Sequence, residues 1–125
     1  MATITPVNTR VDNLDENCRL WTWPNMLTAA TDGIAIEQTQ HADLCWQAVG
    51  ANWGGATVAA QGSNDGTNWF PLTNASGGAA ATFTANGGKQ TIERPRYVRP
   101  QLTTAGTAAD ITVTLLARKT PNTRK

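Results

Sequence analysis

The feature that most restricts the fold is a series of short segments in which apolar and polar residues alternate. The clearest segment is Asp110–Ala117, where Ile111, Val113 and Leu115 alternate with threonine and leucine. Such alternation indicates a half-buried β-strand. After residue 33 no connection is long enough for a helical crossover, so parallel βαβ units are not expected. The sequence predicts an all-β chain forming a single antiparallel β-sandwich, and a jelly roll is one topology that fits.

The expected strands are short and are separated by turn-forming residues. They cover residues 33–37, 43–50, 56–62, 69–72, 81–85, 89–93, 96–102 and 110–117. Pro100 cannot donate a hydrogen bond to a neighbouring strand, so the segment 96–102 is expected near a sheet edge. The residues expected in the core are large apolar side chains at alternating positions: Trp46, Val58, Trp69, Phe83, Val98, Ile111, Val113 and Leu115.

The start of the chain lacks this alternation, and residues 1–17 are expected to form an extended N-terminal arm. Within and just beyond the arm, residues 12–20 could form one or two helical turns, because Asp12 is a good N-cap. The sandwich domain is expected to span residues 18–118, and residues 119–125 to form a basic tail.

The next apolar stretch, Leu20–Trp23, precedes a proline. Pro24 is expected to end this stretch or to confine it to a sheet edge. A short helical turn is expected within residues 25–31, around Met26 and Leu27.

Charge is unevenly distributed along the chain. Residues 1–88 contain two basic and seven acidic residues, whereas residues 89–125 contain eight basic and two acidic residues, which gives the net charge of +1. Such a chain could dock on an oppositely charged neighbour or on a copy of itself. Alternatively, folding interleaves the two halves and the polarity disappears. Nucleic acid is not an expected partner, because aromatic and basic residues are not interleaved as a single-strand binder needs.

The sequence offers little material for catalysis or metal binding. One His and two Ser leave no evident hydrolytic triad, and His41 would need ligands from a loop and a strand together. No catalytic, cofactor or metal site is therefore expected, and the protein is expected not to be an enzyme. Neither a secretion signal nor a membrane-spanning segment is recognised. Cys18 and Cys45 are either both reduced or joined in one bridge.

Five tryptophans supply much of the apolar area. Trp46 and Trp69 lie within expected strands, whereas Trp21, Trp23 and Trp53 lie at strand edges or in loops. These three could cover a small core under the loops, anchor a protein interface or stack on sugar rings. Together with apolar residues of the arm they form the set of partner-interface candidates: Ile4, Val7, Val11, Trp21, Trp23 and Trp53.

The most specific local pattern is the segment Val58–Trp69. Asp65 and Gly66 favour a tight hairpin between two strands, because both tolerate positive φ. Trp69 then begins the return strand and is expected to pack across the hairpin or into the sandwich.

The segment Gln61–Trp69, followed by Leu72, resembles a hairpin of small β-sandwich virion proteins from tailed bacteriophages. The later segment Arg96–Arg99, a loop and the strand Ile111–Leu115 resemble the way these chains end. The likeness covers about residues 56–117. It implies a non-enzymatic decoration, or cement, protein that binds the capsid lattice and bridges neighbouring subunits, or another accessory virion protein.

On this interpretation the main partner is the major capsid protein, and the chain is made in the host cytoplasm and ends on the capsid surface. A homo-oligomer, either a dimer or a trimer, is expected, and neither a membrane nor a cofactor is involved. A similar hairpin also occurs in carbohydrate-binding jelly rolls. The alternative is therefore a carbohydrate-binding module on a virion or tail surface.

Overall fold

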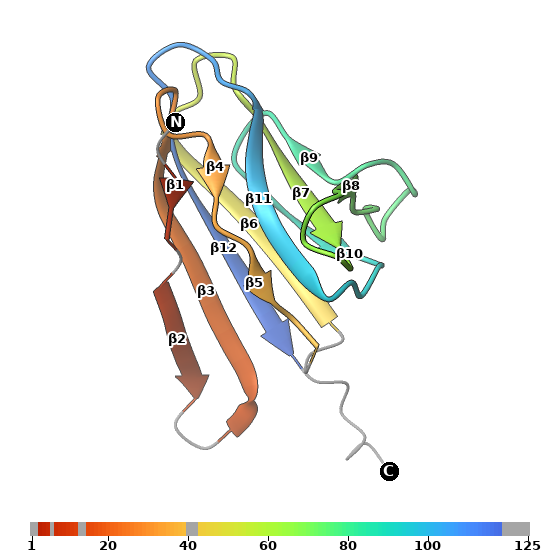
Figure 1. The fold of residues 1–125 in the computed structure, drawn as a ribbon. Helices are drawn as coiled ribbons and strands as arrows, with labels where there is room; N and C mark the ends of the chain where they lie inside the picture. Colours follow the sequence, from red (N-terminus) through yellow and green to blue (C-terminus); the bar gives the residue numbers. More distant parts are fainter. Residues whose placement is uncertain (1–2, 6, 13–14, 40–42, 119–125) are drawn as a thin grey trace.

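A computed structural model describes residues 3–5, 7–12, 15–39 and 43–118 of the chain. In this part all regular secondary structure is β, and two sheets pack face to face (Figure 1). The predicted antiparallel β-sandwich is therefore confirmed, whereas the jelly-roll topology remains a prediction. Among the described residues there is no helix long and apolar enough to cross a membrane.

The first sheet has seven strands in the path β1-β4-β11-β7-β8, with β5 also paired to β11 and β9 also paired to β7. Its pairs are antiparallel except for β1 with β4, which is parallel. The strands are β1 (Thr3–Ile4), β4 (Asp32–Gly33), β5 (Ile36–Glu37), β7 (Thr57–Ser63), β8 (Phe70–Pro71), β9 (Thr82–Phe83) and β11 (Tyr97–Thr104).

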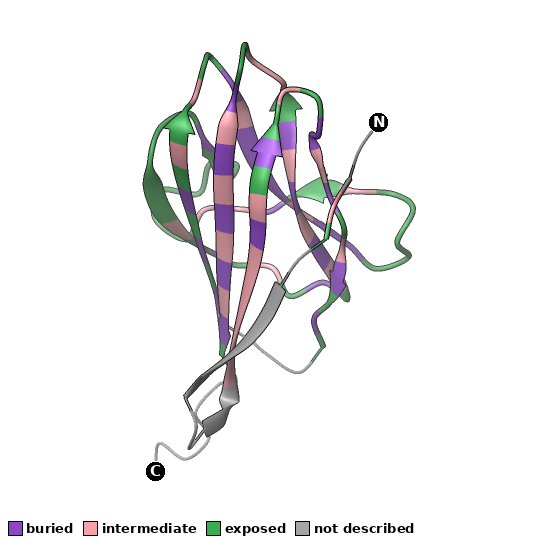
Figure 2. Ribbon diagram, turned by 90° about the vertical axis from the view of Figure 1, so that its left-hand side faces the viewer, coloured by how far each residue is buried: buried purple, intermediate pink, exposed green. Residues whose placement is uncertain are grey.

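The second sheet has five antiparallel strands in the order β10-β6-β12-β3-β2. The strand at its centre is therefore the one nearest the end of the chain. Buried and less buried residues alternate along this strand, which is visible as bands in Figure 2. The strands are β2 (Val7–Asp12), β3 (Asp15–Leu27), β6 (Asp43–Asn52), β10 (Gly87–Thr91) and β12 (Asp110–Arg118).

The helical turns expected near the start of the chain are wrong, because one long strand occupies this region. β3 runs from Asp15 to Leu27 and continues through Pro24. Pro24 and Asn25 together lie opposite Thr112, since Met26 pairs with Ile111 and Trp23 with Val113. The proline thus sits in a β-bulge, where a missing backbone donor is tolerated. Asn25 adopts the left-handed conformation there, with φ of 54°.

The segment expected to be an arm contributes a strand to each sheet. β1 pairs with β4, and β2 pairs with β3 from Val7↔Thr22 to Asp12↔Asp15. The expected domain boundary after residue 17 falls inside β3. The β2–β3 hairpin extends past the ends of β6 and β12 (Figure 1). These strands were not predicted because β1 has only two residues, and because β2, at the edge of its sheet, contains charged residues and lacks clear alternation.

Between the sheets lies one core, centred on two tryptophans. The rings of Trp23 and Trp46 stack with their centroids 6.0 Å apart. Seven of the eight predicted core residues are buried, and Trp69 is the exception because it is only half-buried on the outside of the first sheet. The core also contains residues that were not predicted, including Trp23, Met26, Leu44 and Leu72.

Pro100 is buried within β11, and β11 is an inner strand rather than an edge strand. Its neighbour on one side is interrupted, because β4 pairs with Gln101 and β5 with Val98 and Tyr97. On the other side Pro100 pairs with Ala60 of β7. The N–H of Leu102, two residues further along, donates to Thr31 on the interrupted side, so the nitrogen of Pro100 points to that same side. The proline therefore tolerates an inner strand because its missing donor faces the interrupted neighbour.

Candidate interaction surfaces

The structure separates the six partner-interface candidates. Trp23 is fully buried in the core, so it cannot reach a partner and its selection is wrong. Ile4, Trp21 and Trp53 are partly buried and pack against the core. The backbones of Val7 and Val11 lie in β2, but their side chains are outside the described residues. The expected set therefore does not form one exposed patch.

The two half-buried tryptophans differ in their polar contacts. Trp53 donates from Nε1 to Oδ1 of Asn86 over 2.8 Å, and the same oxygen accepts the backbone N–H of Gly50. This arrangement fixes the loop after β6 against the turn before β10. Trp21 buries its Nε1 without a hydrogen-bond partner among the described residues. Of these two indoles, Trp53 is thus held in place by a hydrogen bond within the chain, whereas Trp21 is not.

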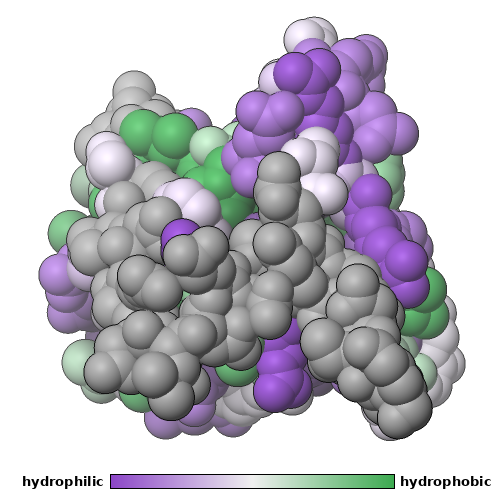
Figure 3. Space-filling model, turned by 90° about the horizontal axis from the view of Figure 1, so that it is seen from below, coloured by the Kyte–Doolittle hydropathy of each residue, from purple (hydrophilic) through white to green (hydrophobic). Residues whose placement is uncertain are grey.

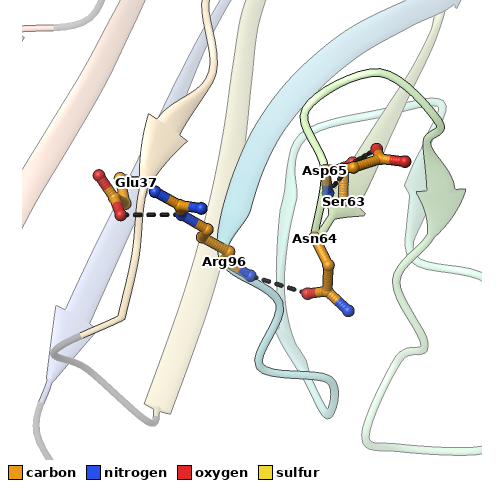
Figure 4. Close-up of polar contacts among 5 residues, drawn as sticks. All are labelled: Glu37, Ser63, Asn64, Asp65 and Arg96. Carbon is orange, nitrogen blue, oxygen red and sulfur yellow. Dashed lines mark hydrogen bonds and ion pairs between the residues drawn. The ribbon is translucent and has the colours of Figure 1, made fainter.

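The segment after β7 is a wider hairpin than the predicted tight turn. Asp65 organises it, because its Oδ1 accepts the backbone N–H groups of Thr67 and Asn68, each over 2.8 Å. Ser63 donates its hydroxyl to the same carboxylate (Figure 4). The Ser63 hydroxyl oxygen also accepts the N–H of Gly66. The N–H groups of Asn68 and Thr67, followed by the Asn68 and Ser63 side chains, hold the pKa of Asp65 well below its usual value. This carboxylate is therefore a structural group.

On the outer surface of the first sheet, Arg99 of β11 reaches the hairpin Gln61–Trp69. Its guanidinium lies 4.1 Å from the centroid of the Trp69 ring, and its Nε donates to Gln61 over 2.9 Å. Burial lowers the pKa of Arg99, and the negative charge of Asp32 partly offsets this effect. Asp32 in turn accepts a hydrogen bond from the Gln101 side chain. Trp69 is thus a stacking partner of Arg99.

Arg96 makes a second connection on this surface. Its Nε contacts Glu37 over 3.0 Å, its guanidinium lies 5.0 Å from the Tyr97 ring centroid, and its backbone N–H reaches Asn64 (Figure 4). The hydrogen bond with Glu37 raises the pKa of Arg96. Both basic residues lie near acidic ones from the first half of the chain. In this region folding interleaves the two halves. We call this surface the charged face; it comprises Asp32, Glu37, Gln61, Trp69, Arg96, Tyr97, Arg99 and Gln101.

The outer surface of the five-stranded sheet has a different composition. Between its two ends the described outward positions of β3, β12, β6 and β10 carry no charged side chain. A depression of about 500 Å³ lies there, lined by residues that include Leu20, Leu116 and Thr114. We call this surface the uncharged face; it comprises Leu20, Thr22, Cys45, Gln47, Val49, Gly88, Gln90, Thr112, Thr114 and Leu116.

The uncharged face was not recognised from the sequence. Its signal is present at the alternate positions of four strands, but only the register shows that these positions adjoin: Leu116 lies between Leu20 and Cys45. Seen from below, one projecting part of the molecule is largely hydrophilic and a hydrophobic patch lies beside it, with further hydrophilic residues elsewhere on this side (Figure 3).

Among the described residues no group of three or more His, Cys, Asp or Glu side chains lies so that it could hold a metal ion, and His41 lies outside this part of the chain. Cys45 carries a free, exposed thiol, so the bridge to Cys18 is not formed. Burial opposes ionisation of Glu93, yet the hydrogen bonds from the Thr73 hydroxyl and N–H outweigh it and lower its pKa. The Glu93 carboxylate thus connects the segment after β8 to the segment after β10.

Comparison with known proteins adds no assignment. No protein-family profile matches the chain, and no curated protein is recognisably similar in sequence.

Proposed function

We propose that this chain is a non-enzymatic structural protein of a phage virion, a decoration protein that binds the capsid lattice and bridges neighbouring subunits. The observation that supports it most directly is the contact between the two segments that resemble small virion proteins. Arg99 of the later segment stacks on Trp69 and binds Gln61 of the hairpin, and Arg96 donates to Asn64. The resemblance therefore concerns one continuous structural unit.

This unit is built for rigidity. The hairpin polar groups of Ser63, Asp65 and Asn68 bind one another, and the Arg99 guanidinium covers the Trp69 ring. A repeated lattice component benefits from such a body, because many identical weak contacts act together only when each subunit presents the same geometry. The major capsid protein is the proposed partner.

Sedimentation with capsids assembled without this chain tests the proposal. We expect saturable co-sedimentation at micromolar protein, with a fixed number of chains per capsid subunit. Capsids already saturated with the unlabelled chain provide the control, since they should take up no labelled protein. Absence of co-sedimentation, or uptake that does not saturate, would contradict a lattice role.

A carbohydrate-binding module is the second candidate, and the charged face favours it. Trp69 and Tyr97 lie there beside the amides and carboxylate of Gln61, Gln101 and Asp32, and sugar sites combine aromatic rings with such groups. A polysaccharide panel read by tryptophan fluorescence separates the two proposals. A response that Trp69→Ala abolishes and Trp53→Ala retains would support sugar binding, and no response across the panel would exclude it.

A further inference from the structure

We propose that the uncharged face is the interface of a two-fold symmetric dimer, in which the β12 strands of two copies cross face to face with Thr114 at the axis. This inference does not rest on the virion role, because it concerns the chain alone. It names the surface and the partner, a second copy of the same chain.

The first argument is the contrast between the two outer surfaces. The charged face carries Asp32, Glu37, Arg96 and Arg99, and these residues bind one another or their neighbours. The uncharged face carries no such group, although five of its ten residues are threonine or glutamine. Val49 is 49% exposed there, and Leu20 and Leu116 line the depression. Depletion of charged residues is typical of the centre of a protein interface.

The second argument is the charge pattern of β12, the central strand. Its outward residues are Asp110, Thr112, Thr114, Leu116 and Arg118, while the residues between them are buried. Thr114 is therefore flanked at equal distance by an acidic residue at one end and a basic residue at the other. The two-fold axis lies in the plane between the two copies, perpendicular to β12, and passes between the two Thr114 residues. Rotation by 180° about this axis exchanges the ends of the strand. Each Asp110 then meets Arg118 of the other copy, and this self-complementarity is what a two-fold interface requires.

The geometry permits this pairing. Facing sheets cross at about 30°, which displaces strand ends four residues from the axis by roughly 7 Å, within the reach of an arginine side chain. Asp43 lies beside Arg118 in register. The axis lies in the interface plane across the strands, so β6 faces β6 of the second copy, and Asp43 lies over the other end of that strand, at Asn52, which carries no charge.

The area is sufficient for a modest dimer. Nine residues along β12 and five strands across give a face of roughly 26 by 19 Å, so two copies together would bury about 1,000 Å². This is the lower limit for a specific interface, and we therefore expect a dimer that dissociates on dilution rather than a permanent one. A second copy fits the face better than nucleic acid does, because the face offers no cations for phosphates.

Sedimentation equilibrium over a wide concentration range tests the dimer. We expect reversible dimerisation of the wild type, and at least a tenfold weakening in Thr114→Arg, which brings two positive charges together at the axis. Thr103→Arg is the matched control, since it adds the same charge to an exposed strand threonine of the other sheet. A wild type that stays monomeric at about 100 µM, a trimer, or equal weakening by both variants would overturn the proposal.

A charge exchange tests the orientation without relying on Thr114. Arg118→Asp should weaken the dimer, and the double variant Arg118→Asp with Asp110→Arg should restore it. In a Cys18→Ser background, the reaction of Cys45 with a thiol reagent should slow as protein concentration rises, but not in Thr114→Arg. Failure of the double variant to restore association, or concentration-independent labelling of the wild type, would rule out this interface. Both readouts concern the chain alone, so they can fail while capsid binding succeeds.

Discussion

The indole N–H of Trp23 donates a hydrogen bond to the backbone carbonyl of Ile34 over 2.9 Å. Trp23 lies in β3 of the five-stranded sheet, whereas Ile34 follows β4 of the seven-stranded sheet. The bond therefore joins the two layers through a residue whose ring also stacks on Trp46. The Trp23 side chain therefore has two roles: its ring packs in the core, and its N–H hydrogen-bonds to the opposite sheet.

Trp23→Phe should destabilise the protein by about 1–3 kcal/mol, because it removes the donor and leaves the Ile34 carbonyl without this bond. The smaller ring adds the cost of a cavity. Urea denaturation followed by circular dichroism measures the change. Trp53→Phe is the control, since it removes an indole bond at an exposed position. A loss for Trp23→Phe no greater than that for Trp53→Phe would contradict the role of the inter-sheet bond.

The adjacent glycines Gly54 and Gly55 should differ sharply when each is replaced by alanine. Both have positive φ, 55° and 84°, so both substitutions carry a backbone cost of about 1 kcal/mol. A Cβ at Gly54 would lie 1.9 Å from the carbonyl oxygen of Thr107, whereas a Cβ at Gly55 meets nothing within 4 Å. Gly54→Ala should therefore cost roughly 3 kcal/mol more. Equal melting temperatures would show that the loop between β11 and β12, which contains Thr107, can move away from the added methyl group.

Deleting residues 1–12 should destabilise the sandwich, because it removes β1 and β2 and leaves the outer edge of β3 without its strand. The loss of several backbone hydrogen bonds, each contributing about 0.5–1.5 kcal/mol, predicts a decrease of roughly 2–5 kcal/mol in the free energy of unfolding. A thermal melt compares the truncated and full chains. An unchanged melting temperature would instead support the arm expected from the sequence.

Glu93→Gln should destabilise the protein at neutral pH but not in acid. The carboxylate accepts the Thr73 N–H and hydroxyl, and its pKa is lowered below the ordinary 4.5. A lowered pKa means that the charged form stabilises the fold above the unfolded pKa, and that this stabilisation is lost as pH falls through the folded pKa. We expect a difference of about 1 kcal/mol at pH 7 that shrinks below pH 4.5. Denaturation curves at both pH values measure it, and a pH-independent difference would contradict this role of the charge.

The sequence predicts the fold class and most of the core because alternation reports directly on burial. Val98, Ile111 and Val113 are examples, since each sits at an inward position of a strand between less buried neighbours. Alternation does not predict burial where the pairing with a neighbouring strand determines the structure. Trp23 lies next to a proline, which suggests the end of a strand or a sheet edge. Only the bulge opposite Thr112 shows that β3 continues past the proline, with Trp23 facing the core.

The same limit applies to the surfaces. Trp69 has the pattern of a core residue, but the guanidinium that covers it comes from a strand 30 residues later in the chain. The uncharged face combines positions from four strands, and no local pattern connects Leu20 with Leu116. Residues that are distant in sequence become neighbours only through strand register, which the sequence pattern does not specify.

The position of β12 at the centre of the five-stranded sheet has a consequence for how the protein is made. β3 and β6 do not pair with each other; only Asp110–Arg118 connects the β2–β3 pair to the β6–β10 pair. Until those residues are synthesised, the central strand of the sheet is missing. The pairing of β3 with β12 then requires contacts between residues some 90 positions apart in the chain. Folding dominated by such distant pairings is slow. A product cut short before Asp110 would therefore leave the β2–β3 and β6–β10 pairs unconnected rather than lack one edge strand, which leaves incomplete chains open to proteolysis instead of assembly.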